Sequence, residues 1–164
     1  MNRRRFTRQL AATAGAFAFA PSLRGHAALA APTLRVDGER INRQLLELAE
    51  FGKNPYGGVS RVAYSEFDQQ GRAWAMGVMR EAGLTISVDA AGNILGRRPG
   101  SNPALNPIVF GSHIDSVPSG GNYDGDVGSL SAIEVARTLG VSKLTTKHPL
   151  EIVMVWRGGM SFHG

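Results

Sequence analysis

The sequence contains no cysteine among its 164 residues. Disulfide scaffolds, cysteine-ligated zinc sites and thiol nucleophiles are therefore excluded for this chain. Aromatic residues make up only 7% and charged residues 19%, whereas 43% of the residues are hydrophobic. This composition is that of an ordinary globular protein rather than of a collagen-like, coiled-coil or disordered chain. The length predicts a single folded domain.

Acidic residues are absent from the first thirty positions, which carry Arg3, Arg4, Arg5, Arg8 and Arg24. The whole chain has 18 basic and 13 acidic residues, so the remainder, without these five arginines, has 13 of each. The formal net charge of +5 therefore belongs to the N-terminal segment. We expect no nucleic-acid-binding surface, because such a surface would need basic residues on the folded domain itself.

The N-terminal segment has the order of an export signal. A basic front precedes a short apolar stretch that ends at Ala20, and the triplet Ala28-Leu29-Ala30 follows. The stretch is too short to span a bilayer, which needs about 20 apolar residues. Consecutive arginines followed by Phe6 resemble a twin-arginine signal. We expect residues 1–30 to be cleaved, no stable membrane anchor, and a periplasmic or exported protein. The alternative is a basic amphipathic helix or a retained anchor.

Hydrophobic periodicity predicts an α/β domain in residues 31–164. Three helices are expected, over residues 37–51, 66–82 and 128–139, and Ser65 is expected to cap the second. Four strands are expected, over residues 84–89, 94–97, 108–110 and 150–156. The first two strands should form a hairpin, and the third should be buried. Helices should flank a mainly parallel or mixed sheet.

The third expected strand leads into His113-Ile114-Asp115. Residues two apart on an extended chain point the same way, so His113 and Asp115 should share one side of a pocket at the strand's carboxyl end. A metal-binding histidine usually donates its other ring proton to a carboxylate, and Asp115 is placed to accept it. Asp124 stands in a glycine-flanked loop before a helix, where tight backbone geometry lets a carboxylate approach a metal.

Each of these residues also has an ordinary structural interpretation. His113 is explained by a simple hydrogen bond, Asp115 by a turn near Pro118 and Asp124 by an Asx turn. Asp126 is explained by capping of the helix that follows it. The cluster, rather than any single residue, favours a metal site.

Two segments carry a family resemblance: residues 111–118, Gly-Ser-His-Ile-Asp-Ser-Val-Pro, and residues 120–125, Gly-Gly-Asn-Tyr-Asp-Gly. They resemble the metal-binding signature of the M20 metallopeptidase superfamily. The resemblance is closest to its amidase, hydantoinase and carbamoylase branch, which includes N-carbamoyl-amino-acid hydrolases, allantoate amidohydrolases and β-ureidopropionases. Further matching segments bring the resemblance to nearly all of residues 37–156: Gly57-Gly58-Val59-Ser60-Arg61, the helix with Trp74, Glu81-Ala82-Gly83-Leu84 and Asp89-Ala90-Ala91-Gly92-Asn93-Ile94.

The resemblance implies the N-terminal part of a zinc-peptidase-like catalytic domain. In that family His113 would ligate one of two divalent metal ions, Asp124 would bridge both, and Asp115 would orient His113. The metals would be zinc, or manganese, cobalt or nickel. A metal-bound water would attack the carbonyl carbon of a small ureido, carbamoyl or amide substrate, and a glutamate would be the general base. Full-length relatives would be homodimers.

The sequence departs from this family after the last expected strand. The family has a Glu-Glu pair there, whereas residues 157–164 read Arg-Gly-Gly-Met-Ser-Phe-His-Gly, and His163 has no family counterpart. The general-base glutamate is therefore not found. The other ligands and the dimerising lid domain would lie beyond residue 164, so we expect this fragment to be inactive. The alternatives are another M20 activity, such as an aminoacylase or carboxypeptidase, and a non-catalytic gene remnant.

Overall fold

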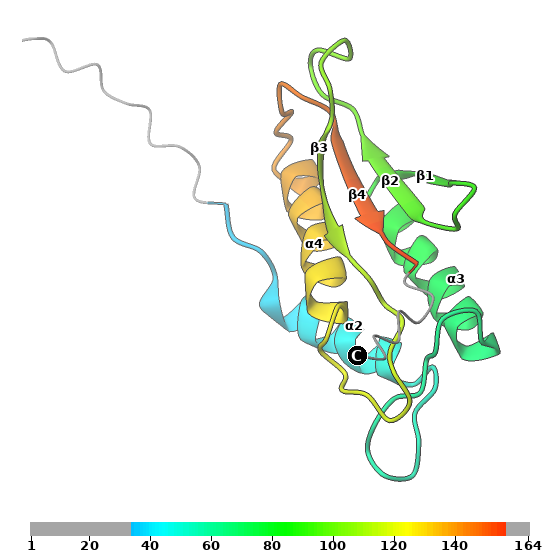
Figure 1. The fold of residues 1–164 in the computed structure, drawn as a ribbon. Coiled ribbons are helices and arrows are strands. Elements are labelled where there is room, and N and C mark those ends of the chain that lie inside the picture. Colours follow the sequence, from blue (N-terminus) through cyan, green and yellow to red (C-terminus); the bar gives the residue numbers. More distant parts are fainter. Residues whose placement is uncertain (1–33, 157–164) are drawn as a thin grey trace, which may run out of the picture. The chain divides into compact units, whose positions relative to one another are not determined.

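The structure is a computed structural model that describes residues 34–156. The expected signal peptide and the segment after Trp156, including His163, lie outside these residues. The described elements, in chain order, are α2 (Gly38–Ala49), α3 (Glu66–Glu81), β1 (Thr85–Val88), β2 (Ile94–Arg98), β3 (Ile108–Ser112), α4 (Asp126–Val141) and β4 (Leu150–Met154) (Figure 1). No helix within residues 34–156 is long and apolar enough to cross a membrane.

The four strands form one mixed sheet in the order β1-β2-β4-β3. β1 and β2 pair antiparallel as the expected hairpin, and β2 pairs antiparallel with β4. Only β3 and β4 are parallel, with Phe110 opposite Ile152. The expected α/β class and the mixed alternative are therefore confirmed, whereas a mainly parallel sheet is not observed in the described residues.

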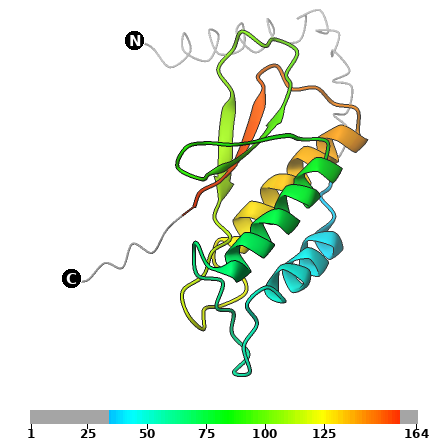
Figure 2. The same ribbon diagram turned by 90° about the vertical axis from the view of Figure 1, so that its right-hand side faces the viewer.

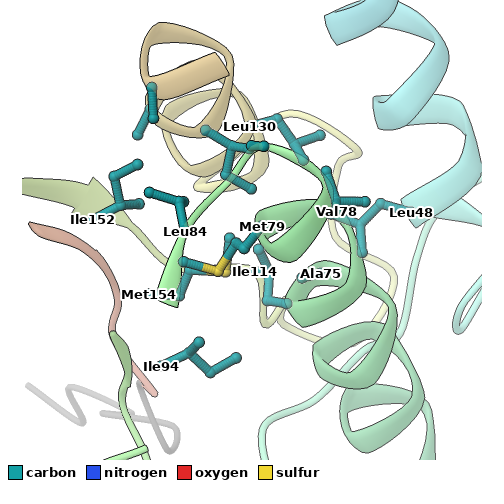
Figure 3. Packing of buried hydrophobic residues seen from close by; sticks show 14 of the residues in the cluster. Leu48, Ala75, Val78, Met79, Leu84, Ile94, Ile114, Leu130, Ile152 and Met154 are labelled. Carbon is teal, nitrogen blue, oxygen red and sulfur yellow. The ribbon is translucent and has the colours of Figure 1, made fainter. Parts of the chain in front are cut away.

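The three described helices lie on the same side of the sheet (Figure 2). α4 packs on β3 and β4, α3 packs on β1, and α2 packs on α4. The hydrophobic core fills the space between helices and sheet (Figure 3). Its fully buried members come from every layer and include Leu48, Met79, Ile94, Leu130 and Ile152. Burial of such apolar surface contributes roughly 25 cal/mol per Å² and holds α4 firmly against the parallel strand pair.

Local signals explain where α2 and α3 begin. Asp37 is the N-cap of α2 and accepts a hydrogen bond from the Arg40 amide at 2.9 Å. Ser65 is the N-cap of α3 and accepts from the Asp68 amide at 3.2 Å, as expected from the sequence. Each side chain satisfies an amide that the first helical turn leaves without a partner.

The expectation that β3 is a buried strand is wrong. Ile108 is 52% exposed and Val109 is 54% exposed. Within the described residues β3 is the edge of the sheet, because it pairs only with β4. Only one of its faces packs on α4, where Phe110 contacts the core. An apolar run of this length does not distinguish a central strand from an edge strand.

Candidate metal site

The β3–α4–β4 unit brings the candidate site residues to one edge of the sheet. β3 ends at Ser112, directly before His113, and α4 begins at Asp126, two residues after Asp124. The chain leaving β4 stays at the same edge, since the Val155 amide donates to the Ser112 carbonyl at 2.8 Å. Open α/β sheets bind ligands at the carboxyl ends of their parallel strands, and this is that end of β3 and β4.

The structure brings His113 and Asp115 together. Nδ1 of His113 lies 3.0 Å from the main-chain oxygen of Asp115 and 3.5 Å from its carboxylate Oδ1. The nearer acceptor is thus the carbonyl, whereas the sequence pointed to the carboxylate. A neutral imidazole that donates from Nδ1 keeps its lone pair on Nε2, the nitrogen that would face a metal.

Gly125 packs directly against the His113 ring. A Cβ atom at this position would lie 2.5 Å from Cε1 of His113, and the residue has φ +75°. Both facts require glycine, because other residues strain at such a φ and their side chains would strike the imidazole. Ser129 of α4 adds a second tie, since its hydroxyl donates to the His113 carbonyl at 3.0 Å. The start of α4 and the His113 segment are therefore fitted closely to each other.

Asp124 lies in the turn before α4 with an exposed side chain. Its charge acts on the same neighbourhood as His113, because both groups influence the pKa of Asp126. Residues 34–156 nevertheless contain no group of three or more histidine or acidic side chains placed to hold a metal ion. The donor chemistry of His113 fits a divalent metal, but the described residues do not provide the three protein ligands of a catalytic zinc site.

A buried ion pair lies behind this site. Arg61 and Asp126 approach to 2.7 Å, and each side chain is only 1% exposed. Burial raises the pKa of Asp126 to about 6; Asp124 adds to this effect, whereas Arg61 and His113 oppose it. The suggested role of Asp126 as a helix cap is wrong: the N-cap of α4 is Gly125, without a side-chain cap bond.

Sequence reasoning missed the pairing of Arg61 with Asp126. The two residues are 65 positions apart, and a single arginine and a single aspartate at such a distance carry no signal of contact. The family resemblance marked Arg61 as the last residue of a matching segment, but gave it no role.

A second cluster surrounds Trp156, where the chain leaves β4. The indole Nε1 donates to Asp68 at 2.6 Å, and the Trp156 amide donates to the Asn93 side chain at 2.9 Å. The ring lies 4.0 Å from that of Tyr64, centroid to centroid, and the Arg72 guanidinium lies over it at 4.2 Å. Burial lowers the pKa of Arg72. These contacts fix the direction in which the chain leaves the sheet.

Known proteins resemble this chain in both sequence and fold. The family model of Peptidase family M28 matches residues 93–158. An N-carbamoyl-L-amino acid amidohydrolase from Geobacillus stearothermophilus is 42% identical over 118 residues, which cover 72% of this chain and 29% of the relative. A ureidoglycolate hydrolase from Oryza sativa subsp. japonica is 44% identical over 119 residues, which cover 73% of this chain and 25% of the relative.

A solved hydantoinase/carbamoylase family amidase from Burkholderia ambifaria aligns with a TM-score of 0.72 and 44% identity. The alignment covers 74% of this chain and 30% of that structure. Over the matched part, this chain resembles the hydantoinase/carbamoylase family of amidases in both sequence and fold. The resemblance stated from the sequence is thereby confirmed. The chain spans 29% and 25% of the lengths of the two relatives named above.

Proposed function

We propose that this chain takes part in the metal-dependent hydrolysis of a non-peptide C–N bond in a small N-carbamoyl or ureido acid. The observation that carries the proposal is its 42% identity to an N-carbamoyl-L-amino acid amidohydrolase over 118 residues. The structure supports it by placing His113 directly after β3, at the carboxyl end of the parallel strand pair.

In this proposal His113 ligates a metal through Nε2, Asp124 is a second ligand, and Asp115 orients the imidazole. When bound, a divalent metal such as zinc, manganese, cobalt or nickel would act as a Lewis acid that activates water and polarises a carbonyl group. Gly125 excludes side-chain atoms from the ring face, so the imidazole is held in one orientation. The other ligands must come from outside residues 34–156, because the described residues form no three-ligand group.

A chimaera tests this proposal. Residues 37–156 would replace the matching segment of the Geobacillus enzyme, and ammonia release from N-carbamoyl-L-amino acids would be measured with added Mn²⁺. We expect turnover in the chimaera and its loss with His113→Ala. The matched control is His148→Ala, because His148 contacts the Asn106 carbonyl, distant in sequence from the site. A chimaera that is folded and inactive, or one unaffected by His113→Ala, would refute the assignment.

A second candidate is hydrolysis of a peptide or N-acyl bond. The match of Peptidase family M28 to residues 93–158 favours it. The same chimaera would be assayed with dipeptides and N-acetyl amino acids. Faster turnover of these substrates than of N-carbamoyl amino acids would select the second candidate.

We also propose export through the twin-arginine route, which rests on the arginine-rich front of the sequence. The substitutions Arg4→Lys and Arg5→Lys together should block export, because the route depends on paired arginines in the signal. Cell fractionation of a strain producing the full chain would measure this. Unchanged export of the double-lysine form would exclude the twin-arginine route.

A further inference from the structure

We propose that Arg61 is a positioning residue that sets the spacing between the two halves of the candidate metal site, namely the His113–Asp115 segment and the Asp124 loop. The inference rests on the proposed function, because it takes His113 and Asp124 as metal ligands. Arg61 itself is fully buried and touches no ligand atom in this proposal. It acts through the main chain on either side of the two ligands.

The first set of contacts joins Arg61 to the His113–Asp115 segment. Nε donates to the Ile114 carbonyl at 2.6 Å. The Arg61 amide donates to the Ser116 hydroxyl, and the Arg61 carbonyl accepts from the Ser116 amide, both at 2.9 Å. Asp115 therefore lies between two residues that Arg61 holds. Val59 and Gly120 extend this tie, since each accepts the other's amide at 2.9 and 2.8 Å.

The second contact joins Arg61 to the Asp124 loop. Nη2 lies 2.7 Å from Oδ2 of Asp126, the first residue of α4 and two positions after Asp124. One guanidinium thus contacts both the segment that follows β3 and the helix start that follows the loop. The position of Asp124 relative to His113 depends on this connection and on the packing of Gly125 against the ring.

The third set anchors the guanidinium itself. Nη1 donates to the Leu48 and Phe51 carbonyls, at 2.8 and 3.0 Å, where α2 ends. A cation is favourable at these helix-terminal carbonyls. Gly71 of α3 leaves room for the arginine stem, because a Cβ atom there would lie 2.8 Å from Cδ of Arg61. Lysine has one nitrogen and cannot reproduce contacts made from Nε, Nη1 and Nη2 in one plane.

A purely structural Arg61 and a positioning Arg61 differ in their effect on metal binding. Buried ion pairs are weak contributors to stability, and their best-attested benefit is specification of one arrangement. Loss of residues that support metal ligands typically lowers metal affinity about 10–100-fold. If Arg61 only stabilises the fold, its replacement lowers the melting temperature but leaves metal affinity unchanged wherever the protein is folded.

The test is a titration of the full chain with Mn²⁺. Binding is measured by the paramagnetic broadening of the His113 imidazole signals in NMR spectra. Thermal unfolding is measured in parallel, and titrations are run where every variant is folded. We expect Arg61→Lys to raise the apparent dissociation constant for Mn²⁺ at least about tenfold. The matched control is Arg137→Lys, because Arg137 also donates to carbonyls at a helix end, those of Val78 and Glu81 on α3. Its dissociation constant should stay within about twofold of that of the parent chain.

If the Arg61→Lys variant does not fold, the Asp126→Asn variant is titrated in its place. This substitution removes the negative charge that pairs with Arg61 and keeps the shape of the side chain. We expect the same rise in the dissociation constant for Mn²⁺. Unchanged Mn²⁺ affinity in the folded Arg61 or Asp126 variant, with binding that His113→Ala abolishes, overturns the positioning role alone. Mn²⁺ binding that His113→Ala leaves unchanged, or no binding by the parent chain, overturns the proposed metal site and the inference with it.

Discussion

At the scale of single residues, the site is held by groups that are not themselves candidate ligands. Arg61 satisfies carbonyls from α2 and from the His113 segment while it neutralises Asp126. Oδ1 of Asp126 is buried without a hydrogen-bond partner among the described residues, in keeping with the raised pKa of this carboxyl. The pair is therefore costly to disturb from one side only, because the partner left behind stays buried and charged.

A double-mutant cycle measures this dependence. Arg61→Met should lower the free energy of unfolding of the full chain by about 3–5 kcal/mol, since it leaves the Asp126 carboxylate unpaired. Asp126→Ala in the Arg61→Met background should cost less than it does alone, with a coupling energy of about 1–3 kcal/mol. Urea denaturation at neutral pH provides all four values. Strict additivity of the two substitutions would show that the ion pair contributes nothing specific.

Gly125 provides a second prediction at this scale. Gly125→Ala combines a strained backbone at φ +75° with a Cβ atom 2.5 Å from the His113 ring. The backbone alone should cost about 1–3 kcal/mol, and displacement of the imidazole should weaken Mn²⁺ binding as well. The matched control is Gly140→Ala in α4, where no atom lies within 4 Å of the added Cβ. That change should stabilise the chain by about 0.5–1 kcal/mol. Urea denaturation and the Mn²⁺ titration compare the two, and equal effects would contradict the prediction.

At the scale of elements, the sequence predicts what is encoded locally. Ser65 marks the start of α3, and Asp89 with Asn93 marks the β1–β2 hairpin, because each signal acts within a few residues. The proximity of His113 and Asp115 is equally local, since the residues are two apart on the chain. The edge position of β3 and the docking of α4 depend instead on pairing between distant segments. For the same reason, the sequence did not predict the Arg61–Asp126 pair.

The turn of the β1–β2 hairpin leads to a prediction about how the stability of the fold depends on pH. The side-chain hydrogen bond from Asn93, with main-chain amides of Asn93, Ala91 and Gly92, lowers the pKa of Asp89 below its ordinary value of 3.8. A carboxylate whose pKa is lower in the folded state stabilises the fold above the unfolded pKa. It loses that contribution as the pH falls through the folded pKa. Asp89→Asn should therefore unfold at a lower temperature than the parent chain at pH 7, and the gap should shrink as the pH falls below 3.8. Thermal unfolding across this range measures the gap, and a gap independent of pH would count against the turn's charge dependence.

At the scale of the whole molecule, the described part of the chain has a buried hydrophobic core and one exposed strand edge. Fully buried residues of α3, α4 and β4 form one continuous cluster. The outer edge of β3, in contrast, carries the exposed Ile108 and Val109 and pairs with no strand other than β4 among residues 34–156. An exposed strand edge of this kind is an aggregation hazard, because its amides and carbonyls can template another strand.

The last prediction tests whether this edge governs self-association. Val109 lies opposite Glu151 in the β3–β4 register, and Glu151 already contacts Arg97 at 3.4 Å. Val109→Lys would add a second cation beside this carboxylate and place a charge on the edge strand, a common natural defence against edge-to-edge pairing. The lysine form of the full chain should therefore show a larger monomer fraction than the parent chain by size-exclusion chromatography with light scattering, and a similar melting temperature. Val135→Lys is the matched control, because Val135 is 38% exposed and belongs to α4 rather than to the edge strand. If Val135→Lys raised the monomer fraction as much as Val109→Lys did, general surface charge rather than the β3 edge would control the association.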